Sequence, residues 1–470
     1  MRLLLITNRY PVDADDPASP FVPHFVNALI SCGVQADFLT PSYASELGHG
    51  QGWLQGNIER MPGQECPGHP TQISQWGGHS CPLTGTAAEQ PFQDSLLTRP
   101  IDGDPEQIRR GGSQTRPNDS DHGVRVFRFR TGTTAPVGSW NLLNPLSWIR
   151  LARFMRNGRT MGKRLCAGNT YHHILALWAL PSGHFAQTLS RRFHVPYSVW
   201  CLGSDIYTWA RRPLIRGRIA GILTGASHVF ADGEDLCRRI RSWLEIDAIF
   251  LPSFRPLEGL EGLEPPPPTE SPRFLYLGRL HRDKGIFELL MAFAHVRMAL
   301  LHATLRYVGD GPEKRKLETL AAEMHLLRPD DLEANSVLVG GAVSHEGVVR
   351  ALHECDWVVI PTRSDSIPLV FTEAVQAMRP VIGTDAGDLG TLIRRFGLGH
   401  VSPSAESRDL ASTMIRAVHD PVFDLRGRAK LLQLFDPRRS AQSFCDRVFP
   451  SLHRPPESPP VNTIAQMSHV

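Results

Sequence analysis

The 470-residue sequence lacks several patterns that mark specialised classes of protein. Its eight cysteines are scattered, with no CxxC pair and no metal-ligand spacing, which is typical of buried thiols in a reducing cytosol. The formal net charge of +3 is small for this length and argues against a general nucleic-acid-binding protein. No window approaches the roughly 20 apolar residues of a membrane-spanning helix. These absences favour a cytoplasmic globular protein, or one attached to the inner face of a membrane.

The first forty residues alternate between strand and helix patterns. The apolar run at 2–7 is too short for the hydrophobic region of a secretion signal and is expected to form a buried strand. A helix is expected over 21–32, where Phe21 and Phe25 share a face, and a second strand over 34–41. This strand–helix–strand order predicts a parallel sheet.

The apolar periodicity is then lost until residue 124. Residues 44–122 are rich in Gly, Gln, Pro, Ser, Thr and Asp, and we interpret them as a disordered insertion that cannot bury enough surface to offset its ordering entropy. The α/β alternation then resumes as far as residue 252. The expected elements are strands at 124–130, 173–178, 197–202 and 227–232, and helices at 142–164 and 213–226.

A Pro-rich segment, 253–272, divides the chain, because its four consecutive prolines favour an extended spacer. A second α/β series follows over 273–434. Its expected strands lie at 273–278, 304–309, 336–341, 356–361 and 379–384. The chain is long enough to bury at least two cores. The sequence therefore predicts an α/β protein of two Rossmann-like domains, 1–252 and 273–434, with parallel sheets and a cleft that receives ligands at the carboxyl ends of the strands.

The first group of candidate residues lies in the loop GRLHRDKG, 278–285, between a buried strand and a helix. The loop places Arg279 and Lys284 at the carboxyl end of the strand. A bidentate guanidinium and a compact ammonium could together neutralise a diphosphate group. The alternative is two solvated charges on an ordinary loop, and this motif alone does not separate the two.

The second group lies over 365–373, DSIPLVFTE. Pro368 suits the first turn of a helix and Ser366 lies near its cap, so Asp365 is expected in the loop and Glu373 one to two turns into the helix. The free amides at the start of the helix form an anion site. The segment thus offers an acceptor for sugar hydroxyls, donors for phosphate and a carboxylate for a ribose diol. The alternative is a capped helix with two surface acids.

Five ordered segments resemble the GT-B glycosyltransferases, specifically the retaining GT4 family (glycosyl transferases group 1). They are GRLHRDKG, YVGDGPEKRKLETL, VGGAVSHEGVVRAL, CDWVVIPT and SDSIPLVFTEAVQAMRPVIGTDAGDL. The resemblance is strongest over 273–400 and continues more weakly into 2–41 and 171–240. It implies the GT-B fold and a closing helix, 435–452, that returns to the first domain. The Pro/Ser-rich residues 453–470 are expected to form a disordered tail.

The resemblance also implies a donor site at the positions that match the family's motifs. Arg279 and Lys284 would hold the donor diphosphate, Asp365 would face the donor sugar, and Glu373 would bind the nucleotide ribose. Asp365 stands where the family usually has the longer glutamate. The implied catalytic residues are Arg279, Lys284 and Asp365, and the implied donor-binding residues are Gly278, Arg279, Lys284, Asp365, Ser366, Leu369, Val370 and Glu373.

The first half departs from the family's pattern near the expected sugar site. Leu175 and Leu177 stand in an HxHW-like segment, and Leu202 in an HGSD-like loop, at positions where histidine is common. Asp205 in that loop is the acceptor-side candidate, and a turn-stabilising role is an equal alternative. The irregular setting of His172, His173 and His184 favours ordinary histidines over a metal site, and the resemblance implies metal independence.

The substrates that the resemblance implies are a nucleotide sugar and a sugar or lipid-linked acceptor, with transfer by a hexosyltransferase-type enzyme in surface polysaccharide or glycolipid synthesis. The departures at Leu177, Leu202 and Asp365 keep open a non-catalytic nucleotide-sugar-binding protein of the same fold. Another GT-B activity, such as sugar-nucleotide epimerisation, is a third reading. The basic helix 142–164 raises the hypothesis of peripheral membrane contact, and a solvated basic face is the favoured interpretation.

Overall fold

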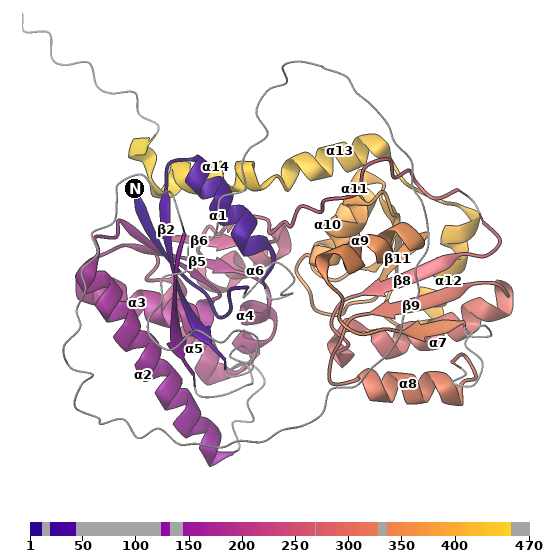
Figure 1. Ribbon diagram of the computed structural model, residues 1–470, viewed down its shortest axis with the longest axis horizontal. Helices are drawn as coiled ribbons and strands as arrows, with labels where there is room; N and C mark the ends of the chain where they lie inside the picture. The colour runs from indigo at the N-terminus through magenta and orange to yellow at the C-terminus, as the bar shows by residue number, and fades with distance from the viewer. Residues whose placement is uncertain (12–18, 44–123, 132–143, 268, 328–335, 453–470) are drawn as a thin grey trace, which may run out of the picture. The chain divides into compact units, whose positions relative to one another are not determined.

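The computed structural model describes residues 1–11, 19–43, 124–131, 144–267, 269–327 and 336–452 (Figure 1). The predicted insertion at 44–122 and the predicted tail at 453–470 lie outside the described residues. In the described part of the chain, no helix is both long enough and apolar enough to cross a bilayer. The described strands form two separate parallel sheets.

The first sheet has the strand order β3-β2-β1-β4-β5-β6-β7. The chain runs outward from β1 to β3 and then returns to place β4 beside β1, which makes the gap between those two strands the topological switch point. The register pairs Leu3 with Ala36 on β2 and with His173 on β4. Its strands are β1 (Arg2–Ile6), β2 (Gln35–Ser42), β3 (Arg125–Arg130), β4 (His173–Leu177), β5 (Tyr197–Cys201), β6 (His228–Ala231) and β7 (Ile249–Phe250).

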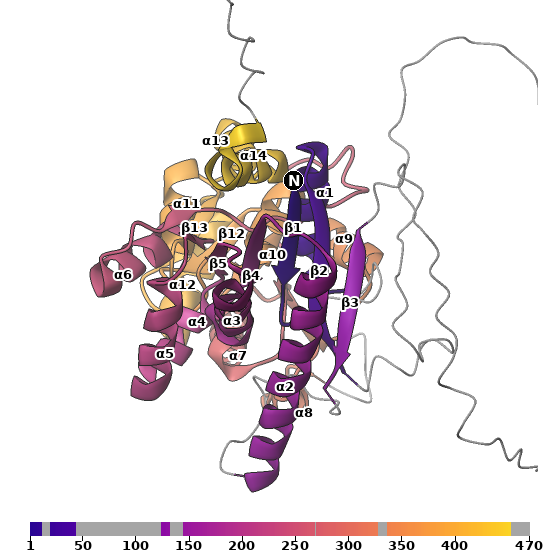
Figure 2. The same cartoon turned by 90° about the vertical axis from the view of Figure 1, so that its left-hand side faces the viewer.

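Helices cover both faces of this sheet, as alternating side chains on its strands require. Leu4 and Ile6 of β1 pack with α2, α3, α5 and α6 on one face, whereas Leu3 and Leu5 pack with α1 and α14 on the other (Figures 1 and 2). The helices are α1 (Phe21–Ser31), α2 (Pro145–Gly168), α3 (His184–Phe193), α4 (Ser204–Tyr207), α5 (Pro213–Leu223), α6 (Glu234–Leu244) and, from the end of the chain, α14 (Pro437–Val448).

The second sheet repeats the same winding, with the order β10-β9-β8-β11-β12-β13 and its switch point between β8 and β11. Its strands are β8 (Arg273–Leu277), β9 (Thr304–Val308), β10 (Val337–Val339), β11 (Trp357–Ile360), β12 (Val381–Thr384) and β13 (Gly399–Ser402). Its helices are α7 (Ile286–Ala299), α8 (Lys314–Glu323), α9 (His345–Glu354), α10 (Leu369–Gln376), α11 (Leu389–Phe396), α12 (Ser407–His419) and α13 (Leu425–Leu434). The predicted α/β class with two parallel, Rossmann-like sheets is confirmed.

The segment between the two sheets, which was predicted to be an extended spacer, packs against helices of the second sheet. The sequence did not predict this packing. Leu257, Leu260 and Leu263 pack against the core formed by α9, α10, α11 and α13. The Gln376 side chain accepts a hydrogen bond from the Leu257 amide at 2.9 Å and donates one to the Arg255 carbonyl at 2.9 Å. This segment is therefore anchored to α10.

The helix α14 packs on the first sheet although it follows the second sheet in sequence. The Phe444 ring centroid lies 5.9 Å from that of Phe25 on α1 and 5.3 Å from that of Phe230 on β6. Phe444 is fully buried. The core of the first sheet is thus completed by a helix from the end of the chain.

Candidate active site

The two motif loops meet at the switch point of the second sheet. One loop follows β8 and carries Lys284, and the other follows β11 and carries Asp365. The Lys284 ammonium donates a hydrogen bond to Asp365 Oδ1, and the Thr362 hydroxyl donates one to Asp365 Oδ2 at 2.7 Å. The ammonium and the carboxylate are only partly exposed, at 34% and 23% of their side chains. A cation and an acid from separate loops therefore converge where parallel sheets bind ligands.

Gly285 allows these two loops to touch. Its φ of +73° lies in the left-handed region, which costs other L-residues about 1–2 kcal/mol. A Cβ atom at this position would lie 2.0 Å from the Pro361 carbonyl oxygen of the second loop. The Arg363 amide also donates to the Asp283 carbonyl at 3.2 Å. The close approach that places Lys284 beside Asp365 therefore requires glycine.

Arg279 lies on the same loop with its side chain exposed, and its backbone carbonyl accepts a hydrogen bond from the Tyr276 hydroxyl at 2.8 Å. The turn after β9 supports this part of the loop from behind. A Cβ atom on Gly309 would lie 1.9 Å from the Gly278 carbonyl oxygen, and the Leu280 amide donates to the Asp310 carbonyl at 2.9 Å. The Gly-rich turn at 309–312 is thus a backbone support of the motif loop.

The helix α10 begins at Leu369, so Pro368 is its cap residue rather than part of its first turn. No side chain caps this helix, and the Ser366 hydroxyl is buried without a partner among the described residues. Leu369, at the start of α10, packs against the apolar cluster of the first sheet. The first amides of α10 thus remain available to an anion at the loop of Asp365.

Glu373 is buried in the second turn of α10 and is paired with Arg255 from the segment between the sheets. The distance from Arg255 Nη2 to Glu373 Oε1 is 2.7 Å. Burial raises the pKa of the Glu373 carboxyl, and the Arg255 charge opposes that rise. The predicted ribose contact of Glu373 is untested, and any such ligand would share this carboxylate with Arg255.

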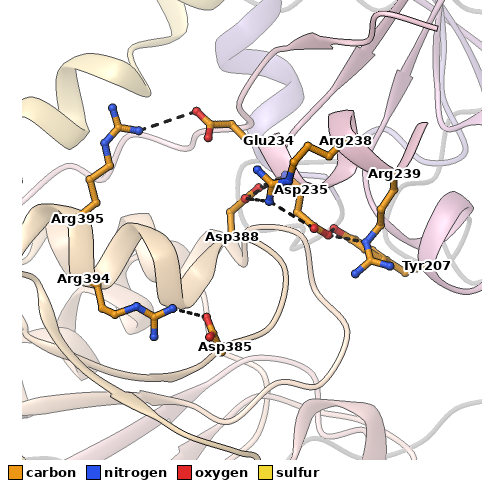
Figure 3. A network of polar contacts seen from close by, with 9 residues as sticks. All are labelled: Tyr207, Glu234, Asp235, Arg238, Arg239, Asp385, Asp388, Arg394 and Arg395. Atoms are coloured by element: carbon orange, nitrogen blue, oxygen red, sulfur yellow. Dashed lines mark hydrogen bonds and ion pairs between the residues drawn. The ribbon is translucent and has the colours of Figure 1, made fainter. Parts of the chain in front are cut away.

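Loops of the first sheet contact the second motif loop directly. A Cβ atom on Gly203 would lie 3.4 Å from Ser366 Cβ, and one on Gly233 would lie 2.3 Å from Ser366 Oγ. Gly233 is the N-cap residue of α6 and has no side chain that could accept a hydrogen bond from the first amides of this helix. The Asp388 carboxylate, from the loop after β12, accepts the Asp235 amide hydrogen at 2.9 Å and 3.0 Å and so caps α6 (Figure 3).

Further polar contacts extend this link (Figure 3). Arg238 Nη2 lies 3.7 Å from Asp388 Oδ1. Arg395 Nη1 of α11 lies 3.9 Å from Glu234 Oε1 of α6. Asp235 also accepts hydrogen bonds from the Tyr207 hydroxyl at 2.8 Å and from Arg239 Nε at 2.6 Å. The helix α6 is therefore tied to the second sheet at its first turn.

Two buried carboxyl groups lie behind these loops. Asp205 Oδ2 accepts the Ala179 amide hydrogen at 3.1 Å, whereas Oδ1 of Asp205 and Oδ1 of Asp232 have no hydrogen-bond partner among the described residues. Burial raises the pKa of both groups. Asp232 reaches a pKa of about 8, and the carboxylates of Asp205, Asp365 and Asp388 add to the effect of burial. Asp232 is therefore largely protonated at neutral pH.

The raised pKa of Asp232 predicts a specific pH dependence of stability. Because the folded protein holds this proton more tightly than the unfolded chain, the stabilisation is complete below pH about 4 and is lost as the pH rises through about 8. We expect the melting temperature to fall between about pH 4 and 8 and this contribution to level off above that range, and Asp232→Asn to flatten the fall in a calorimetric pH series. Asp247→Asn, at an exposed carboxylate, is the control. Equal slopes in the wild type and Asp232→Asn would contradict the assignment.

The positions where the sequence lacks the family's histidines lie in or beside the core. Leu175 and Leu177 are fully buried against α1 and α14, and Leu202 packs beside them. The acceptor role of Asp205 stays a prediction, and the contact with Ala179 fits the alternative role in stabilising the backbone. In the described ranges, no group of three or more His, Cys, Asp or Glu residues is arranged to hold a metal ion.

Sequence reasoning missed Arg255, Asp232 and Asp388. Arg255 lies in the expected linker, and Asp232 ends an expected strand. Asp388 lies in the quoted segment GTDAGDL, where its position just after a strand was the available signal. Their contacts depend on segments far apart in sequence, which periodicity and spacing do not reveal.

Comparison with known proteins finds a family model that matches the part of the chain carrying the motif loops. Residues 271–420 match the family model "Glycosyl transferases group 1". The chain is 28% identical over 262 residues to TuaC, a glycosyltransferase assigned to teichuronic acid biosynthesis in Bacillus subtilis (strain 168). That alignment covers 53% of this chain and 62% of TuaC. The chain thus spans less than two thirds of the length of this relative.

Solved structures resemble the chain over nearly its whole length. Sucrose-phosphate synthase from Thermosynechococcus elongatus matches with a TM-score of 0.64 and 19% identity, over 94% of this chain and 97% of that one. HepE from Anabaena, in complex with UDP-glucose, matches with a TM-score of 0.58 and 13% identity, over 95% and 98%. The chain therefore has the GT-B fold, and its residues 271–420 match the Glycosyl transferases group 1 family.

Proposed function

We propose that the chain transfers a sugar from a nucleoside-diphosphate sugar to an acceptor hydroxyl. The observation that carries this proposal is the contact of Lys284 with Asp365 at the switch point of the second sheet. Arg279 and the first amides of α10 belong to the same two loops. Both loops lie within the residues that match the family model.

The chemical difficulty of this transfer is the charge that develops on the departing diphosphate. Arg279 and Lys284 neutralise that charge, and the amides of Leu369 and Val370 donate to its oxygens. Each such preorganised donor is typically worth about 2.7–4 kcal/mol of barrier, so several are needed. Asp365 keeps Lys284 in position before the donor binds and then accepts hydrogen bonds from the donor sugar. Glu373, held by Arg255, binds the ribose.

The finer features of the proposal follow the resemblance to the GT4 family. They are retention of the anomeric configuration, hexosyl transfer without a metal ion, and a place in surface polysaccharide or glycolipid synthesis in the cytoplasm. The similarity to TuaC supports the polysaccharide context, and the HepE complex with UDP-glucose supports a nucleotide sugar as donor. The acceptor is then a sugar or a lipid-linked sugar.

A donor screen tests the function. The purified full chain is incubated with a panel of UDP- and GDP-sugars and a lipid extract, and products are identified by mass spectrometry. Transfer from at least one donor supports the proposal. Calorimetric binding of a nucleotide sugar without any turnover, in the presence of varied acceptors, would instead support the alternative.

That alternative is a non-catalytic nucleotide-sugar-binding protein, and one observation favours it. Leu175 and Leu177 are fully buried in the apolar core, so these two positions offer no polar group to the sugar. The screen separates the two functions directly. A sugar-nucleotide epimerase would give a changed nucleotide sugar when no acceptor is added.

We also propose that α2 binds the surface of an anionic membrane. The exposed side chains of Leu146, Trp148 and Ile149 lie at the start of this helix. The helix contains six Arg and Lys residues and no acidic residue. An apolar end with a basic face is typical of helices that lie at a lipid interface. Such contact would bring the first domain close to a lipid-linked acceptor.

Liposome co-sedimentation checks this prediction. We expect binding to anionic vesicles at low salt, little binding to zwitterionic ones, and loss of at least tenfold when Arg150, Arg153 and Arg156 are replaced by glutamate. The control carries the same charge reversal at three exposed arginines of the second domain, Arg408, Arg416 and Arg426. Equal loss in both triple variants would show a general charge effect, and the absence of binding at low salt would exclude the contact.

A further inference from the structure

A second charged site lies in the first domain. It is a groove of about 430 Å³ lined by residues of α2, α3 and α5. Figure 2 shows these three helices along the first sheet. The volume of the groove falls within the range of small-molecule sites, about 300–1,000 Å³. The charged and titratable residues that line it are Arg159 of α2, His184, Arg191 and Arg192 of α3, and Arg218 of α5.

The groove carries positive charge that nothing in the described chain balances. Four guanidinium groups line it and no carboxylate does. Within the ranges that the structure describes, none of these four arginines pairs with an acidic side chain. Four cations so close together repel one another, and the repulsion is relieved when an anion binds among them.

His184 holds two of these arginines in place without neutralising them. Its Nε2 lies 2.9 Å from Arg159 Nη2, and its Nδ1 contacts Arg218 Nη2. A neutral imidazole has one acceptor nitrogen, so it cannot accept hydrogen bonds from both guanidiniums at once. Burial lowers the pKa of His184 to about 4, and the charges of Arg218 and Arg159 contribute to that shift. At neutral pH the ring is therefore uncharged, and at least one guanidinium lacks a satisfactory acceptor.

We infer that this groove binds a phosphate group, with Arg159 and Arg218 as its principal ligands and Arg191 and Arg192 at its rim. Guanidinium groups bind phosphate oxygens bidentately, and two or more of them match the charge of a phosphate ester. All four arginines lie in the first domain. No residue of the two motif loops lines the groove, so the inference does not rest on the proposed transfer. The phosphate belongs either to a free phosphate ester or to a lipid headgroup.

Calorimetric titration of the full chain with inorganic phosphate tests the site. We expect Arg159→Gln and Arg218→Gln each to weaken binding about tenfold or more, because each removes a charge-assisted contact. Arg408→Gln, at an exposed arginine of α12 outside the groove, is the matched control and should leave binding unchanged. Both groove arginines are exposed, so these variants are expected to fold.

The ring signals of His184 provide an independent readout by NMR. A bound anion offsets the two neighbouring cations, so the pKa of His184 should rise when phosphate is added. It should also rise in ligand-free Arg218→Gln, which lacks one of those cations. If phosphate binds in the calorimetric titration but leaves the pKa of His184 unchanged, the bound anion does not lie in this groove.

A vesicle-binding experiment distinguishes the two sources of the phosphate group. Binding of inorganic phosphate that both groove variants weaken assigns the site to a free phosphate ester. Binding only to phosphatidate-containing vesicles, again weakened by Arg159→Gln and Arg218→Gln but not by Arg408→Gln, assigns it to a lipid headgroup. If neither probe binds, or if the groove variants bind as the wild type does, the inference is wrong.

Discussion

Replacing Lys284 by alanine is expected to lower kcat by two to three orders of magnitude while leaving the fold intact. The ammonium is the charge nearest to the carboxylate of Asp365, and the loss of one preorganised donor in a transition-state site typically costs a factor of about 10²–10³. The stability cost should stay below about 1 kcal/mol, because the ion pair is partly exposed. Steady-state kinetics with the donor found by the screen, together with thermal melting, measures both quantities.

The matched control for this variant is Arg282→Ala. Arg282 lies two residues away on the same loop and carries the same charge, but its side chain is exposed. Its removal should change kcat less than about threefold. Full activity in Lys284→Ala would reject the phosphate role of this residue, whereas equal losses in the two variants would indicate a general effect of loop charge.

Replacing Gly285 by alanine should also disable the site, by moving the loops apart. The added Cβ would lie 2.0 Å from the Pro361 carbonyl oxygen, and this oxygen belongs to backbone that cannot rotate away. The left-handed φ of +73° adds strain for any residue with a Cβ. A displacement of about 1 Å can cost a factor of about 10² in rate, so kcat should fall by that order.

Gly168→Ala provides the comparison for Gly285→Ala. Gly168 ends α2, and an added Cβ there would meet no atom within 4 Å. Alanine is the better helix former by about 1 kcal/mol, so this variant should melt at the same temperature or higher with unchanged kcat. If Gly285→Ala behaved in the same way, the close contact of the two loops would not matter for transfer.

The fold was predictable from the sequence because its strands are apolar and regularly separated by helical patterns. Two strands, β7 and β13, were not predicted, and each omission has a physical reason. β7 is two residues long, too short for periodicity, and β13, GHVS, begins with glycine and has two polar residues among its four. The predicted domain boundaries, including 253–272 as a separate linker, stay predictions.

The candidate site was predictable to the extent that it lies on strand ends. Lys284 and Asp365 follow adjacent strands of a parallel sheet, and the topology brings their loops together. The contacts of Arg255 with Glu373 and of Asp388 with α6 were not predictable, because each joins segments that only the folded chain makes neighbours. The roles of Arg279, Lys284, Asp365 and Glu373 in binding a donor stay predictions.

The position of α14 has a consequence for how the chain is made. Phe444 packs between Phe25 and Phe230, yet it is translated after the whole second sheet. During synthesis the amino-terminal domain therefore leaves the ribosome with part of one apolar face uncovered, and this face stays open to chaperones until α14 emerges. Nascent chains halted before Pro437 would be the aggregation-prone species, and maturation of the first domain is coupled to the synthesis of α14.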